Sequence, residues 1–164
     1  MPLSIGFLTT RILQKDSDQS NIFKCGIAVA PVSNWIYYDS IYSERYLGLP
    51  TPFDNARGYF NSDTTQQAKK LKNKKLLLVH GTGGWPTMSL LLSTSDSLFP
   101  PLSDDNVHYQ NTMMMVRALE EKDVLFRQLS YPDENHGIVA LRPHLYHSLT
   151  DFILNDCFGL NKVL

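Results

Sequence analysis

Three short apolar runs, each followed by a helix-like segment, constrain the fold of this chain more than any other feature. The runs cover residues 25–30, 74–79 and 123–129. The first is almost wholly apolar, which is typical of a strand buried on both faces of a parallel sheet. Strands that alternate with helices favour an α/β fold, because a helix crosses over between parallel neighbours. We therefore expect three parallel strands with flanking helices.

Amphipathic segments lie around these runs. Helices are expected at residues 6–15, 63–72, 107–121 and 143–157, and loops at residues 16–21, 48–57 and 130–138. In the first helix one face would carry Leu8, Ile12 and Leu13. In the last helix one stripe would carry Leu145, Leu149, Phe152 and Ile153. Ser62 or Asp63 would cap the helix at residues 63–72.

A carboxylate and an imidazole follow the second and third runs. Asp104 lies beyond the loop after the second run, and His136 lies in the loop after the third. A catalytic histidine needs a carboxylate that holds its tautomer. In α/β hydrolases these two groups come last, in the chain order Ser, Asp, His. In the alternative interpretation, Asp104 caps a helix and His136 is an ordinary loop histidine.

Two further features have more than one interpretation. The segment His80-Gly81-Thr82 follows the second run and is either a plain strand end or part of a site. The aromatic side chains between residues 35 and 46 either fill a core or line a pocket. The remaining histidines, His108, His144 and His147, are expected on the surface.

Composition excludes several classes of function. A net charge of −1 argues against binding to nucleic acid or to a membrane surface. No apolar run reaches the ~18–20 residues of a membrane span, and the first residues lack the basic region of a signal peptide. No cysteine–histidine cluster has zinc spacing and no glycine-rich phosphate loop occurs, so neither metal nor cofactor is expected. Cys25 and Cys157 suit two free thiols or one bridge equally well.

Several longer motifs resemble one enzyme family. They are Ala30-Pro31-Val32-Ser33-x-Trp35-x-Tyr37-Tyr38-Asp39-Ser40, Glu44-Arg45-Tyr46-x-Gly48-Leu49-Pro50, His80-Gly81-Thr82, Asp104-Asp105-Asn106-Val107-His108 and His136-Gly137. Across residues 7–159 the chain resembles the dipeptidyl peptidase IV family of prolyl-oligopeptidase-type serine peptidases. Members of that family remove N-terminal dipeptides with proline or alanine in the second position. The resemblance implies that residues 1–164 are a C-terminal fragment of the peptidase's α/β-hydrolase domain, a partial fold with its last three parallel strands.

The resemblance also implies roles for individual residues. Asp104 resembles the acid of the catalytic triad, and His136 resembles its base. The residues that match the family's substrate site are Val32, Trp35, Tyr38, Tyr42 and Val107, which would line a pocket for proline, and Asn106, which would help hold the substrate. Cys25 and Cys157 match a family disulfide. The implied partner is a peptide substrate, with a homodimer of the full-length parent compatible with it, and the implied location is extracellular or a plasma-membrane ectodomain.

Three departures from the family pattern bear on activity. Leu3 or Ser4 stands where the nucleophile is expected, without the glycine turn that exposes it. The propeller domain that binds the substrate amino group has no counterpart here. Residues 83–103 form an atypical insert before Asp104. We therefore expect a chain with acid and base but no nucleophile, inactive alone, or else a non-enzymatic scaffold protein. The run at residues 25–30 would also form an exposed, aggregation-prone edge.

Overall fold

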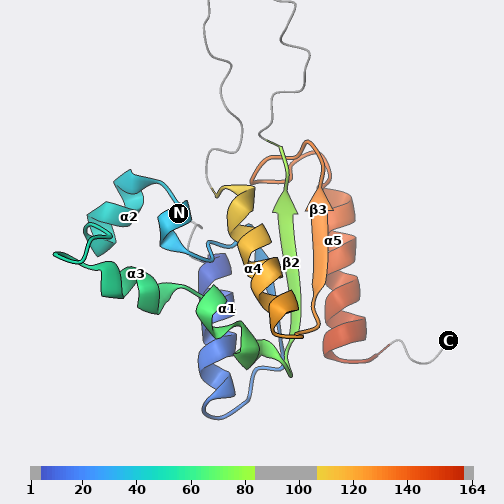
Figure 1. The fold of residues 1–164 in the computed structure, drawn as a ribbon. Coiled ribbons are helices and arrows are strands. Elements are labelled where there is room, and N and C mark those ends of the chain that lie inside the picture. The colour runs from blue at the N-terminus through green and yellow to red at the C-terminus, as the bar shows by residue number, and fades with distance from the viewer. Residues whose placement is uncertain (1–4, 84–106, 161–164) are drawn as a thin grey trace, which may run out of the picture.

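The computed structural model describes residues 5–83 and 107–160, which form a single parallel sheet with helices on both faces (Figure 1). The strands are β1 (Cys25–Val29), β2 (Lys75–Gly81) and β3 (Arg127–Tyr131), in the order β1-β2-β3. Ile27 pairs with Leu77, and Leu77 pairs in turn with Arg127. The predicted α/β fold with three parallel strands is confirmed.

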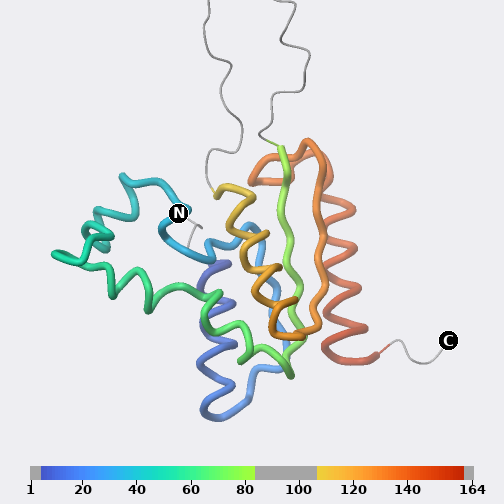
Figure 2. Tube along the Cα trace, in the orientation of Figure 1, coloured from blue at the N-terminus to red at the C-terminus, as the bar shows by residue number. Residues whose placement is uncertain are grey.

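The central strand divides the core into two halves. Leu76 and Leu78 face one cluster, and Leu77 and Val79 face the other, because successive side chains of a strand point to opposite faces. The first cluster is covered by α1 (Ile5–Ser17), the 3₁₀ helix η2 (Thr65–Leu71) and α4 (Tyr109–Glu121). The second is covered by α5 (Arg142–Asp151) and the π-helical turn η4 (Phe152–Cys157). The chain path in Figure 2 follows this three-layer arrangement.

A small lobe projects beside the sheet (Figure 1), and its residues 35–62 include eight of the 18 aromatic residues of the chain. It consists of the 3₁₀ helix η1 (Trp35–Tyr37), α2 (Ser40–Leu47) and α3 (Ala56–Ser62). Its inner side chains form a third cluster, which contains Ala30, Val32, Trp35, Tyr59 and Val107. This cluster connects the lobe to the sheet and to the start of α4.

Helix α1 packs very closely on β1. A Cβ atom on Gly26 would lie 2.8 Å from Leu13 Cδ1, and one on Gly6 would lie 2.7 Å from Pro31 Cα. The predicted apolar face of this helix is only partly correct. Leu13 is buried, whereas Leu8 and Ile12 are 46% and 47% exposed. Helix α1 contacts β1 through the side that carries Thr9 and Leu13, and Leu8 and Ile12 therefore face solvent.

Of the two predictions between β1 and β2, the loop was too long and the helix was correct. Helix α3 begins inside the segment 48–57, which was predicted as a loop, and Asn55 caps it by accepting a hydrogen bond from the Gly58 amide at 3.1 Å. The helix predicted at residues 63–72 is present and is of the 3₁₀ type, from Thr65 to Leu71. Asp63 ends α3 and also accepts a hydrogen bond from the Thr65 amide, so the two helices share one junction.

Two elements near the C-terminus also differ from their predicted bounds or geometry. The third strand starts at Arg127 rather than at residue 123, because Asp123 adopts a left-handed turn conformation, with φ 52°. The last helix changes to π-helical geometry at Phe152. Since a π turn holds more residues than an α turn, Ile153 leaves the buried stripe and is 39% exposed.

Strand β1 is less buried than predicted. Ala28 is fully buried, but Val29 is 37% exposed, and β1 pairs only with β2 within the described sheet. No helix in the described ranges is both long enough and apolar enough to cross a membrane.

Candidate active site

The C-terminal ends of β2 and β3 lie at one edge of the sheet, because the two strands are parallel (Figure 1). Beyond the strand end, the Thr82 amide still donates to the Tyr131 carbonyl at 2.9 Å. The loop after β3 then carries His136, which is half-buried. In open α/β sheets this edge is where ligands bind.

Two glycines allow the loop that carries His136 to lie against the end of β2. A Cβ atom on Gly81 would lie 2.2 Å from the carbonyl oxygen of Glu134, and one on Gly83 would lie 2.7 Å from the same oxygen. The Gly83 amide donates a hydrogen bond to that oxygen at 2.8 Å. Any larger side chain at Gly81 therefore has to displace the backbone of the loop.

Contacts within the loop itself also hold its conformation. The side chain of Glu134 is only 9% exposed, and its Oε2 accepts a hydrogen bond from the Ala140 amide at 3.2 Å. Ile138 is 1% exposed in the core although its φ is 44°, a left-handed conformation that costs a branched residue free energy. These contacts fix the backbone on both sides of His136.

His80 links the end of β2 to the start of α4. Its side chain is 1% exposed, with Nε2 2.8 Å from the Val107 carbonyl oxygen and Nδ1 2.6 Å from Thr112 Oγ1. A carbonyl oxygen can only accept, so Nε2 carries the proton. In the neutral ring Nδ1 then accepts a hydrogen bond from the Thr112 hydroxyl.

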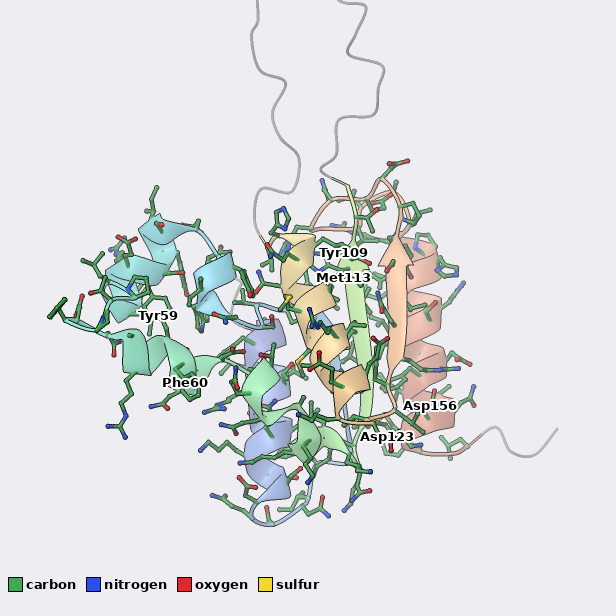
Figure 3. All side chains as sticks on the ribbon, in the orientation of Figure 1. Tyr59, Phe60, Tyr109, Met113, Asp123 and Asp156 are labelled. Carbon is green, nitrogen blue, oxygen red and sulfur yellow. A yellow bond between two sulfur atoms is a disulfide. The ribbon has the colours of Figure 1, made fainter. Side chains whose placement is uncertain are left out.

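The environment of His80 favours this neutral form. Burial lowers its pKa to about 4, because the charged ring would lose its hydration. Positive charge on His136 or His108 would lower the pKa further, whereas the bond to the Val107 carbonyl opposes the shift. Tyr109 lies in the first turn of α4 (Figure 3). Its ring meets the His80 ring edge-on, at 5.3 Å between centroids.

The five residues predicted to line a pocket lie together in the third cluster. Val32 and Val107 are fully buried, Trp35 is 8% exposed, and Tyr38 and Tyr42 are half-buried. The rings of Trp35 and Tyr42 stack at 5.7 Å between centroids, and those of Tyr38 and Tyr42 meet edge-on at 5.5 Å. Their role as a substrate pocket stays a prediction.

The two remaining site predictions, Asp104 and Asn106, lie outside the described residues, and so does most of the predicted insert at residues 83–103. The described part of α4 does bear on the alternative role considered for Asp104. The cap of this helix is His108, whose Nδ1 accepts a hydrogen bond from the Gln110 amide at 3.2 Å.

Sequence reasoning missed three supporting residues of this region: Glu134, Asn111 and Thr112. Asn111 and Thr112 are both fully buried. The sequence did contain a signal for them. Each lies four residues before one of the buried residues Met115 and Val116, and residues four apart share one face of a helix. Two small polar residues on the inward face of a helix indicate buried hydrogen bonds.

Cys25 and Cys157 form a disulfide, with their Cα atoms 5.8 Å apart. Of the two alternatives for the cysteines, the structure therefore has the bridge. It fastens the start of β1 to the end of η4 on the α5 side of the sheet.

Known proteins match this chain over most of its length. The model of the prolyl oligopeptidase family matches residues 4–83 and 93–159. Venom dipeptidyl peptidase 4 of Vespa velutina is 46% identical over 156 residues, and dipeptidyl peptidase 4 of Bos taurus is 41% identical over 157. These matches cover 95% and 94% of this chain but 17% of each relative.

A solved structure gives the same result. The crystal structure of dipeptidyl peptidase 4 from Porphyromonas gingivalis is similar with a TM-score of 0.72 and 35% identity, over 92% of this chain and 18% of that chain. This protein thus spans less than a fifth of the length of the relatives it matches. The chain belongs to the prolyl oligopeptidase family and corresponds to the C-terminal part of a catalytic domain of the dipeptidyl peptidase IV type.

Proposed function

We propose that this chain forms the acid–base and pocket side of the active site of a serine dipeptidyl peptidase. The observation that carries the proposal is the gathering of five predicted pocket residues at the edge of the sheet that also bears His136. His80 joins the two regions, since it bonds to Val107 and precedes Gly81, which touches the loop of His136.

The aromatic cluster has the chemistry that a proline side chain needs. A pyrrolidine ring is small, flat and apolar, and aromatic walls gain contact area with it at little entropic cost. Trp35 and Tyr42 present stacked rings, and Tyr38 stands edge-on to Tyr42. An alanine methyl group would fit the same space with less contact. We therefore propose peptides with proline or alanine in the second position as substrates.

In the proposed mechanism, the Asp104 carboxylate holds the His136 imidazole in the tautomer that accepts a proton. The imidazole takes the proton of a serine hydroxyl as that oxygen attacks the carbonyl carbon of the second residue. It then gives the proton to the departing amine, and the dipeptide stays bound to the serine as an ester. Water, deprotonated by the same imidazole, then attacks the ester, and the imidazole returns the proton to the serine oxygen as the dipeptide leaves.

The motif that exposes a catalytic serine is missing from these residues. No Gly-x-Ser-x-Gly motif occurs in the 164 residues. We infer that the 164-residue chain alone releases no dipeptide, and that the nucleophile comes from polypeptide outside it. For the whole protein we propose an extracellular or membrane-ectodomain location, which the disulfide supports because such bonds persist in oxidising compartments.

The same absence favours a second candidate, a non-enzymatic interaction protein that keeps the fold. The two candidates differ in whether the acid and the base still function when a nucleophile is present. This difference can be measured directly in a chimera.

The test places residues 5–160 of this chain in the dipeptidyl peptidase 4 of Vespa velutina, in place of the matching region. One version keeps residues 84–92, which the family model leaves unmatched, and a second version omits them. The assay is release of nitroaniline from Gly-Pro-para-nitroanilide. We expect at least one version to be active, and His136→Ala in that version to lower kcat by at least about 10³-fold.

Two outcomes would contradict the peptidase proposal. Chimeras that fold, as judged by cooperative melting, but are inactive both with and without residues 84–92 would favour the scaffold protein. An active chimera that keeps its rate after His136→Ala would show that His136 is not the base.

A further inference from the structure

A single buried amide joins the aromatic lobe to helix α4. The side chain of Asn111 is fully buried in the first turn of the helix. Its Oδ1 accepts hydrogen bonds from the amides of Ser33 and Asn34, at 3.0 and 3.2 Å. Its Nδ2 donates to the carbonyl of Tyr37 at 3.1 Å. One side chain therefore holds both ends of the segment that contains Trp35.

The segment also bonds back to the helix. The hydroxyl of Ser33 donates to the backbone carbonyl of Asn111 at 2.7 Å. On its other side, the carbonyl of Ser33 accepts hydrogen bonds from the amide and hydroxyl of Thr64. Thr64 thus secures the start of the segment, whereas the Tyr37 end is held to the helix by Asn111.

The next residue of the helix holds the opposite part of the cluster. Thr112 bonds to His80, and His80 bonds to the carbonyl of Val107. Asn111 and Thr112 are both fully buried and adjacent in sequence. The first helical turn is therefore bonded both to the segment that contains Trp35 and, through His80, to the backbone of Val107, and both residues belong to the third cluster.

Packing alone does not call for an amide at this position. Burying a polar side chain is costly unless its hydrogen bonds are made, and an apolar residue would fill the same space without that requirement. The bonds of Asn111 go to backbone groups of residues 33–37, beside the predicted pocket residues Val32, Trp35 and Tyr38. The position of Asn111 therefore affects the distances between these pocket residues and helix α4.

We propose that Asn111 is a positioning residue that sets the width of the pocket and so its preference for proline over alanine. This inference rests on the proposed function, since it assumes that the aromatic cluster receives the second residue of a peptide. A pocket of fixed width favours a rigid ring, whereas a looser pocket loses contact with the ring and keeps its contact with a methyl group. The signature is therefore a change in selectivity.

The test uses the full 164-residue chain and two probes, glycyl-prolinamide and glycyl-alaninamide. Binding is followed by NMR through the methyl signals of Val32 and Val107. Asn111→Asp keeps the accepting oxygen but loses the donor to Tyr37, and Asn111→Leu loses every side-chain bond. We expect the aspartate variant to lower the ratio of proline to alanine affinity about three- to tenfold, and the leucine variant to abolish the preference.

Val116→Ala is the matched control. Val116 is buried in the same helix but packs in the first cluster, not in the third cluster with the predicted pocket residues. It should lower stability and leave the affinity ratio unchanged. If the leucine variant does not fold, Ser33→Ala tests the same connection from the other side, through the bond to the Asn111 carbonyl. We expect it to lower the ratio in the same direction.

The outcomes separate the two proposals. If the unaltered chain binds neither probe, the proposed pocket is wrong. If it binds glycyl-prolinamide more tightly and the Asn111 variants that fold keep that preference, the pocket stands and the positioning role of Asn111 is refuted. An equal loss of preference in Val116→Ala would also refute it, because the effect would then follow stability alone.

Discussion

Acid should weaken this fold through the buried histidine at the end of β2. His80 has a pKa of about 4 in the folded protein, against an ordinary value of 6.5. Between these values the unfolded chain binds a proton that the folded protein does not. The contribution of His80 to stability is therefore complete above about pH 6.5 and is lost as the pH falls toward 4.

The magnitude follows from the difference between the two pKa values. A gap from 6.5 to about 4, at 1.36 kcal/mol for each unit, is worth roughly 3 kcal/mol. Solvent screens this contribution little, because the His80 side chain is only 1% exposed. Since small domains unfold with about 5–15 kcal/mol, His80 alone can remove a large share of the stability.

The assay compares urea denaturation of the unaltered chain and of His80→Gln at several pH values between about 7 and 4. Glutamine can still donate to the Val107 carbonyl but does not titrate, so carboxylates contribute equally to both curves. We expect the unaltered chain to lose roughly 3 kcal/mol more than the variant over this range. His147→Gln serves as the control, because His147 is exposed.

Parallel pH curves for the unaltered chain and for His80→Gln would refute the reasoning. That result would mean that His80 is charged, or is accessible to water, in the folded state at neutral pH. A His147→Gln curve as flat as that of His80→Gln would also refute the reasoning, because the loss would then not be specific to the buried ring.

Three further predictions concern stability and association. Replacing Cys25 and Cys157 by serine should lower the free energy of unfolding by roughly 5 kcal/mol in the chain-entropy model, since the bond spans 132 residues; urea denaturation would contradict this with a loss under about 1 kcal/mol. Gly81→Ala should cost about 1–3 kcal/mol and shift the imidazole NMR signals of His136, because the new methyl group meets the Glu134 carbonyl, and unshifted signals would refute the contact. The chain should self-associate at high concentration through β1, and Val29→Lys should raise the concentration at which light scattering appears; a monodisperse unaltered chain would contradict this.

The sheet was predictable because its signal is local. The run that became β2 is continuously apolar from Leu76 to Val79, which is what a strand with a core on each face requires, and its side chains do alternate between two cores. The shifts arose where backbone geometry overrides side-chain pattern. Asp123 turns the chain into a left-handed conformation, and the π turn at Phe152 rotates Ile153 outward; apolar spacing reports neither event.

Only the site residues that belong to sequence motifs could be predicted. The resemblance brought Val32, Trp35 and Val107 together, and the structure places all three in one cluster. The residues that hold them could not be found this way, because Asn111 acts through backbone groups some 77 positions earlier in the chain, and such a pairing leaves no local pattern. Periodicity could have indicated that Asn111 faces inward, since it lies four residues before the buried Met115, but that prediction was not made.

The bond between Cys25 and Cys157 makes most of this polypeptide a covalent ring. A protease that cuts the ring once, at any exposed peptide bond, opens it without separating the pieces. The two products would migrate as one species on a denaturing gel until a reductant is added. In an oxidising environment, such nicked molecules would keep the lobe and the sheet on a single connected framework.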